Sequence, residues 1–291
     1  MTDTTSPEYQ AQPERTQEEA ALRAVFMRAK GFTQRVAAAL QPWRGPEFPD
    51  GTLHKLEIAA RIDYAAVCSL LWEDWLAYGS YVHVRGLAET ATRAAWILGK
   101  GFDSCMGTEE SRARCYELAM AATLDEEVNL FVENASRLQL PGPTPETIAA
   151  SAKMLKWLRD EHANDECDCQ GNGRRKVEPL IQGLARAKPR NQLRIMDDIL
   201  IVWKHTSRVG HHTGIERMLR SDGTRAWIGP AEPWQRVQMF IAALKLYASV
   251  AGWCAERFND AVGRQLMEEM GGLTHAEVLR AVAARHPEQF R

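Results

Sequence analysis

Apolar residues recur in this chain at steps of three and four positions, and this spacing constrains the fold more than any other feature. In the segment from Leu53 to about Tyr78, the positions concerned are Leu56, Ala60, Tyr64, Val67, Leu71 and Trp75. No segment bounded by hairpin turns shows the sustained two-residue alternation of Val, Ile and aromatic residues that half-buried strands require. The spacing therefore predicts an all-α fold, a multi-helix bundle with a long C-terminal helix.

Capping residues and helix breakers set the limits of the expected helices. Gly99 and Gly101 end one helix, and Thr144 followed by Pro145 is a favourable start for another. The segments expected to be helical are roughly 16–40, 53–78, 84–98, 109–138, 145–162, 192–219, 232–270 and 274–286.

The sequence predicts one folded domain after a short tail. Residues 1–14 are polar, contain two prolines and are expected to be disordered, because they cannot offset their ordering entropy by burial. Residues 15–291 are expected to form a single helical domain, since a chain of 291 residues can build one large core.

The run from Val237 to Ala255 is mostly apolar and about as long as a membrane span. Lys245 lies in the middle of this run, where a charge costs about 3 kcal/mol on insertion scales. A buried helix of the bundle is therefore favoured over a transmembrane helix.

Composition and charge are those of an ordinary soluble globular protein, with 45% hydrophobic and 25% charged residues. The formal net charge of −2 exerts no overall attraction on nucleic acid. The N-terminus lacks a basic start followed by an apolar run, so we expect a cytoplasmic protein. Cys68 and Cys254 stand among apolar residues, which is typical of buried reduced thiols. The excess of Arg over Lys is associated with bacterial, GC-rich genomes.

The segment from Gln192 to Leu219 carries much of the titratable chemistry. Its expected apolar side comprises Ile195, Met196, Ile199, Val202, Trp203 and Thr206. Asp198, His205, Arg208 and His212 fall on the polar side and are the catalytic and anion-binding candidates. Any activity is expected to depend on His205 or His212, with Arg208 holding an anionic group and Asp198 orienting a histidine. The alternative is a solvated face with histidines in ordinary surroundings.

Arg85, Glu89 and Arg93 follow one another at steps of four, which places them on one side of a helix. The charges could form a solvated ladder, worth a few tenths of a kcal/mol per pair, or a face that binds an anion or a partner. Trp96 lies on the charged side and favours the binding alternative, because large aromatic residues seek burial.

Cys167 and Cys169, with His162 nearby, are possible metal ligands in a loop that contains Gly171 and Gly173. A structural zinc site needs four ligands, usually with a second cysteine pair, and no second pair is present. We therefore expect neither a metal nor a cofactor.

Two resemblances bear on function. The HEPN-type ribonucleases are helical bundles with an Arg followed four to six residues later by a His, and Arg280 and His286 meet this spacing. The chain more closely resembles uncharacterised bacterial all-α families, through the Arg85 and Glu89 step and through Ser207 and His211. This second resemblance covers about residues 55 to 215 and implies the helical fold without an activity.

The sequence favours a non-catalytic interaction or ligand-binding protein, whose partner is an unknown protein or small molecule, because no nucleophile, metal set or phosphate loop can be assembled from it. The alternative is a hydrolase or HEPN-like nuclease acting through His205 and His212. A cleft shared by His205 with Arg85 or Glu89 would favour the enzyme.

Overall fold

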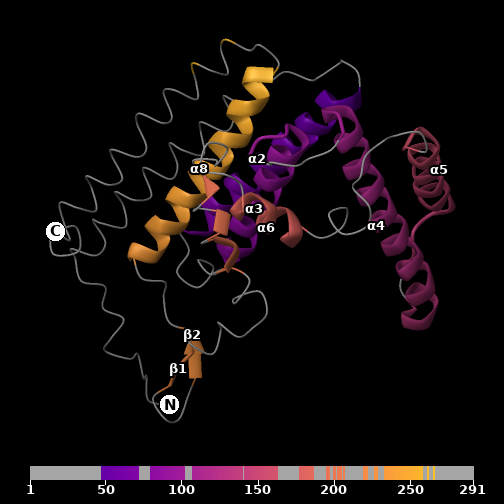
Figure 1. Cartoon of the computed structure of the whole chain (residues 1–291). Helices are drawn as coiled ribbons and strands as arrows, with labels where there is room; N and C mark the ends of the chain where they lie inside the picture. The colour runs from indigo at the N-terminus through magenta and orange to yellow at the C-terminus, as the bar shows by residue number, and fades with distance from the viewer. Residues whose placement is uncertain are drawn as a thin grey trace, which may run out of the picture. The chain divides into compact units, whose positions relative to one another are not determined.

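The computed structural model describes residues 47–71, 79–101, 107–139, 141–162, 177–186 and 233–257, shorter pieces at 195–196, 199–200, 202–204, 206, 219–221 and 226–228, and residues 261 and 265. Its elements are η2 (Glu47–Gly51), α2 (Thr52–Leu70), α3 (Ser80–Ile97), α4 (Glu109–Leu138), α5 (Pro145–His162), α6 (Glu178–Ala185), β1 (Leu219–Ser221), β2 (Ala226–Ile228) and α8 (Pro233–Arg257) (Figure 1). The described part is predominantly helical, which confirms the all-α prediction.

Local chemistry accounts for the helix ends. Gly99 and Gly101 take positive φ angles of 66° and 78° directly after α3, as expected for residues that end a helix. α4 ends at the left-handed Gln139, whose backbone N–H donates to the Ala135 carbonyl. At the start of α5, the Thr144 hydroxyl accepts from the backbone N–H of Thr147 at 3.3 Å.

The chain divides into two units. The first comprises residues 1–42, 60–87 and 202–291, and the second comprises residues 43–59 and 88–201. The predicted tail at residues 1–14 lies outside the described residues. The single domain over residues 15–291 stays a prediction.

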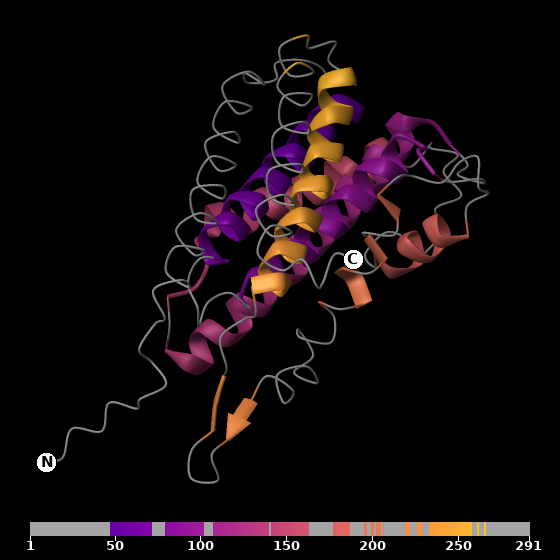
Figure 2. The same ribbon diagram turned by 90° about the vertical axis from the view of Figure 1, so that its left-hand side faces the viewer.

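The first unit contains an aromatic core between α2 and α8. Tyr64 of α2 stacks on Tyr247 of α8 with ring centroids 4.9 Å apart, and it also packs against Phe240. Arg236, which is buried, donates to the Leu71 carbonyl at 3.3 Å beyond the end of α2. Burial, with a smaller contribution from Cys68, raises the pKa of Tyr64 well above its ordinary value. α2 and α8 therefore lie side by side, as Figure 2 shows.

α8 occupies most of the segment predicted to hold the long helix, and most residues beyond Arg257 lie outside the described part. Among the described residues, the segment Gln238–Arg257 is long and apolar enough to cross a membrane, and 61% of its apolar window is buried inside the molecule. A helix buried in a protein core can have the same length and composition. The contacts of Phe240 and Tyr247 with Tyr64 are those of such a core helix.

The second unit contains a smaller core between α4 and α5. Ala121 of α4 packs with Leu155 and Leu158 of α5, and these three residues are buried. Phe48 of η2 packs against this cluster and stacks on Trp157, with ring centroids 6.0 Å apart. η2, α4 and α5 are thereby joined within the unit (Figure 1).

A buried arginine connects α3 to the start of α4 in the second unit. Arg112 donates through Nε and Nη2 to the Ile97 carbonyl, at 3.0 and 2.8 Å, and through Nη1 to the Gly107 carbonyl at 2.7 Å. The guanidinium thus satisfies a carbonyl at the C-terminus of α3, where the helix dipole also favours positive charge.

Three details correct or extend the sequence predictions. α6 (Glu178–Ala185) lies in a segment for which the sequence predicts no helix. Leu219 begins β1 of an antiparallel hairpin, in register with Ile228, whereas the sequence predicts the end of a helix at this residue. The strands are three residues long, too short for their pattern to differ from that of a loop. Cys68 and Cys254 are buried and form no disulfide, which confirms their prediction as buried thiols.

Candidate functional site

The polar side of the histidine-rich segment lies outside the described residues. The candidates that lie there are Asp198, His205, Arg208 and His212. Their catalytic and binding roles therefore stay predictions. The apolar side of the segment is described in part. Its buried members are Ile195, Ile199, Val202 and Thr206. Their burial confirms the sequence prediction of a core-facing side at these four positions.

The Arg85, Glu89 and Arg93 series is partly buried. Arg93 Nη2 lies 3.9 Å from Glu89 Oε2, and the two side chains are only 20% and 25% exposed. The Arg85 guanidinium lies over the Trp203 ring, 4.5 Å from its centroid. The series is therefore not a fully solvated ladder, and its role in binding stays a prediction.

Arg93 also lies over the ring of Tyr116 on α4, 5.5 Å from the ring centroid. Burial raises the pKa of Tyr116, and the nearby Glu117 raises it further, while Arg93 acts in the opposite direction. The phenol therefore remains neutral over the physiological pH range. Arg93 thus contributes to packing between α3 and α4 as well as to the charged series.

Sequence reasoning did not find a hydrogen-bonded pair between α2 and α3. The Nδ1–H of His83 donates to Asp63 Oδ1 at 2.8 Å, and the two side chains are 35% and 24% exposed. The Asp63 carboxylate lies directly against Gly86, in the space that a β-carbon would occupy. The glycine inside a predicted helix was the available signal, because such a residue often marks close approach by a neighbour.

Gly86→Ala is expected to lower the free energy of unfolding by about 1 kcal/mol, although alanine in a helix interior ordinarily raises it by a similar amount. The added methyl group would displace the Asp63 carboxylate from His83. Urea unfolding measures the effect. Gly252→Ala is the matched control, because nothing lies within 4 Å of its added β-carbon and it should stabilise. Stabilisation by both substitutions would contradict the prediction.

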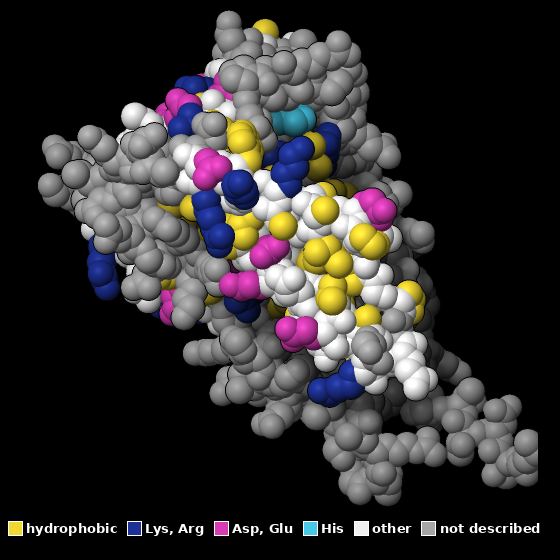
Figure 3. Space-filling model, turned by 90° about the vertical axis from the view of Figure 1, so that its right-hand side faces the viewer, with side chains coloured by type: hydrophobic (Ala, Val, Ile, Leu, Met, Phe, Trp, Pro, Cys, Tyr) yellow, Lys and Arg dark blue, Asp and Glu magenta, His cyan; other side chains and the backbone are white. Residues whose placement is uncertain are grey.

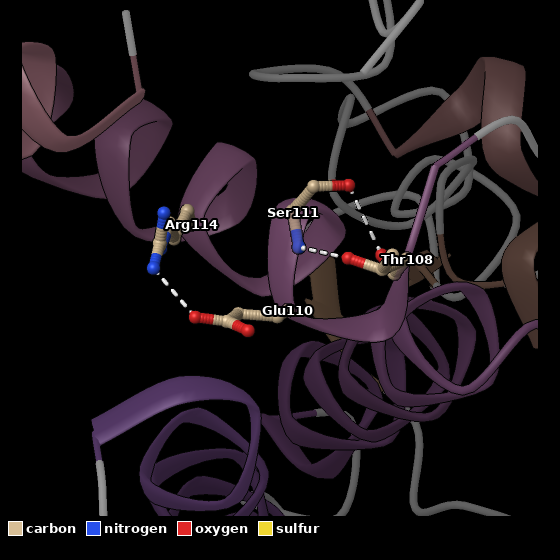
Figure 4. Close-up of polar contacts among 4 residues, drawn as sticks. All are labelled: Thr108, Glu110, Ser111 and Arg114. Carbon is tan, nitrogen blue, oxygen red and sulfur yellow. Dashed lines mark hydrogen bonds and ion pairs between the residues drawn. The ribbon is translucent and has the colours of Figure 1, made fainter. Parts of the chain in front are cut away.

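The start of α4 is closed by its own side chains, as Figure 4 shows. The Thr108 hydroxyl accepts from the Ser111 backbone N–H at 3.1 Å, and the Ser111 hydroxyl donates to the Thr108 carbonyl at 3.1 Å. Glu110 forms an ion pair with Arg114 one turn later. These contacts are those of a helix cap and give this end of α4 a structural role.

Exposed apolar side chains mark the C-terminal half of α4. Leu124, Phe131 and Leu138 are 46%, 64% and 55% exposed and follow one another at steps of seven residues. Seven residues make nearly two helical turns, so the three side chains form one stripe, which we call the α4 stripe. Val128, four residues after Leu124 and three before Phe131, lies next to the stripe and is buried. Figure 3 shows hydrophobic groups interspersed with acidic and basic ones on one face of the molecule.

The described residues contain no group of three or more His, Cys, Asp or Glu side chains that could hold a metal ion. Cys167 and Cys169 lie outside those residues, so the prediction of a metal-free loop stays a prediction. The α4 stripe, an apolar surface bordered by charges, is consequently the feature of the described residues that most directly suggests a function.

Comparisons with protein-family models, with curated proteins and with solved structures found no match for this chain. This outcome is consistent with the resemblance to uncharacterised helical families, and it transfers no activity to the chain.

Proposed function

We propose that this chain is a non-catalytic helical interaction protein that binds a protein partner through the α4 stripe. The exposure of Leu124, Phe131 and Leu138 is the observation that carries the proposal. Removing a large apolar side chain from water contributes about 1.5 to 3 kcal/mol, so covering all three would supply substantial binding free energy.

The construction of the α4–α5 pair supports this proposal. α5 buries one side, through Ser151, Leu155 and Leu158. Leu155 and Leu158 pack with Ala121 of α4 in a cluster whose described members do not include the residues of the stripe. Two helices leave much of each helix uncovered, and large exposed apolar patches on soluble proteins commonly mark interaction sites. The α4 stripe therefore has the chemistry of a helix-to-helix interface.

The enzymatic alternative depends on His205 and His212, which lie outside the described residues. The described residues supply no observation that favours hydrolysis over binding. The interaction function is accordingly the one proposed.

Photo-crosslinking tests the proposal in living cells. A benzoylphenylalanine placed at position 131 of the full chain should give a discrete covalent adduct on irradiation, because the stripe contacts its partner there. The same group at Lys153, an exposed position on α5, is the matched control and should give none. Absence of adducts at positions 124, 131 and 138 alike would overturn the proposed function.

A further inference from the structure

We infer that His83 is a phosphoryl-acceptor site, at which Nε2 of the imidazole takes a phosphoryl group from a high-energy phosphoryl compound. Asp63 is the positioning residue that holds the imidazole for this reaction. The inference goes beyond the proposed interaction function and does not depend on the α4 stripe. It follows from the contact between α2 and α3 within the first unit, where both residues lie.

The hydrogen bond to Asp63 fixes the tautomer of His83. An ionised carboxylate can only accept, so the 2.8 Å contact between His83 Nδ1 and Asp63 Oδ1 requires the proton on Nδ1. In a neutral imidazole, Nε2 then carries the lone pair. A carboxylate that accepts from the other ring nitrogen also makes this lone pair more basic. His83 therefore has the arrangement of an oriented nucleophile.

Gly86 gives the Asp63 carboxylate the space that this contact needs. Asp63 Oδ2 lies where a β-carbon of residue 86 would be, while Oδ1 accepts from His83. Glycine in a helix interior costs about 1 kcal/mol relative to alanine. The chain thus carries an unfavourable helix residue at the position against which the carboxylate is held.

The surface beside the His83–Asp63 pair is open to solvent. Ile62 and Val82 each precede one member of the pair by one residue, and they are 62% and 64% exposed. The His83 side chain is itself 35% exposed. Because Nδ1 is directed to Asp63, the ring edge that carries Nε2 is the one left for a phosphoryl donor to approach.

The transfer step conserves atoms and charge. The Nε2 lone pair forms the N–P bond as the bond from phosphorus to the leaving group of the donor breaks, and the leaving group departs with that electron pair. Positive charge develops on the imidazole ring, and the Asp63 carboxylate stabilises this charge through the Nδ1–H. The proton stays on Nδ1. The product is a phosphohistidine whose hydrogen bond to Asp63 is intact.

Labelling with phosphoramidate, a small high-energy phosphoryl compound whose leaving group is ammonia, tests the inference on purified full-length protein. At about pH 8, where an ordinary imidazole is neutral, His83 should be phosphorylated roughly ten-fold faster than His54. His54 lies on α2 and is partly exposed, so it serves as the internal control. Mass spectrometry of peptides kept out of acid measures both rates, since the N–P bond hydrolyses in acid. Equal rates at the two histidines would overturn the inference.

Two variants test the role of Asp63 in the same labelling experiment. Asp63→Asn removes the charge and should slow phosphorylation of His83 roughly ten-fold, with the rate at His54 unchanged. Gly86→Ala should slow it as well, because the added methyl group displaces the carboxylate. Gly252→Ala, whose β-carbon meets nothing within 4 Å, is the matched control and should leave the rate unchanged.

NMR of the imidazole nitrogens gives a readout that a merely structural role of Asp63 would not move. The proton of the neutral His83 ring should reside on Nδ1 in the wild type and should shift toward Nε2 in Asp63→Asn. Circular dichroism at the labelling temperature shows that each variant is folded. An unaltered labelling rate at His83 in folded Asp63→Asn would overturn the role given to Asp63.

Discussion

Arg112→Met is expected to lower the free energy of unfolding by about 3 kcal/mol. The substitution removes the three hydrogen bonds that the guanidinium donates to the Ile97 and Gly107 carbonyls. Because Arg112 is only 5% exposed, water cannot readily replace the lost donors, and the carbonyls bear a desolvation cost. The segment that connects α3 to α4 therefore loses its hydrogen bonds to residue 112 at both ends, at Ile97 and at Gly107. Urea unfolding followed by circular dichroism measures the change.

Arg112→Lys separates geometry from charge in this prediction. Lysine keeps the positive charge at the C-terminus of α3 but cannot direct donors to two carbonyls as the planar guanidinium does. An intermediate loss, of about 1 to 2 kcal/mol, is therefore expected. Arg159→Met, at an exposed position on α5, is the matched control and should change stability by less than about 0.5 kcal/mol. A value for Arg112→Met equal to that of the control would contradict the role given to this residue.

The helices were largely predictable because their limits depend on neighbouring residues. The sequence predicts a helix from about Glu109 to Leu138, and α4 has these same bounds. Thr144 and Pro145 likewise predict the start of α5, since capping and the fixed φ of proline are local properties. The hairpin at Leu219 was missed because three-residue strands carry no periodic pattern and form through pairing.

The candidate site was not predictable in the same way because exposure depends on tertiary packing. Phe131 and Leu158 are both apolar residues on helices, yet the first is 64% exposed and the second is fully buried. The helical spacing around each residue gives no sign of this difference. The contacts of Arg112 with Ile97 and of His83 with Asp63 join separate helices, so no local pattern contains them. By contrast, the four-residue steps of Arg85, Glu89 and Arg93 were visible in the sequence, and only their partial burial was not.

Phe240→Ala is expected to lower the free energy of unfolding by about 3 to 5 kcal/mol, because Phe240 is fully buried and packs against Tyr64. Truncation removes apolar contacts and leaves a cavity between α2 and α8. Gln238→Ala, at an exposed position on α8, is the control and should stay within about 0.5 kcal/mol of the wild type. Chemical unfolding of detergent-free protein makes both measurements. A negligible loss for Phe240→Ala would show that α8 does not form the core of its unit, and the membrane alternative for Val237 to Ala255 would then gain support.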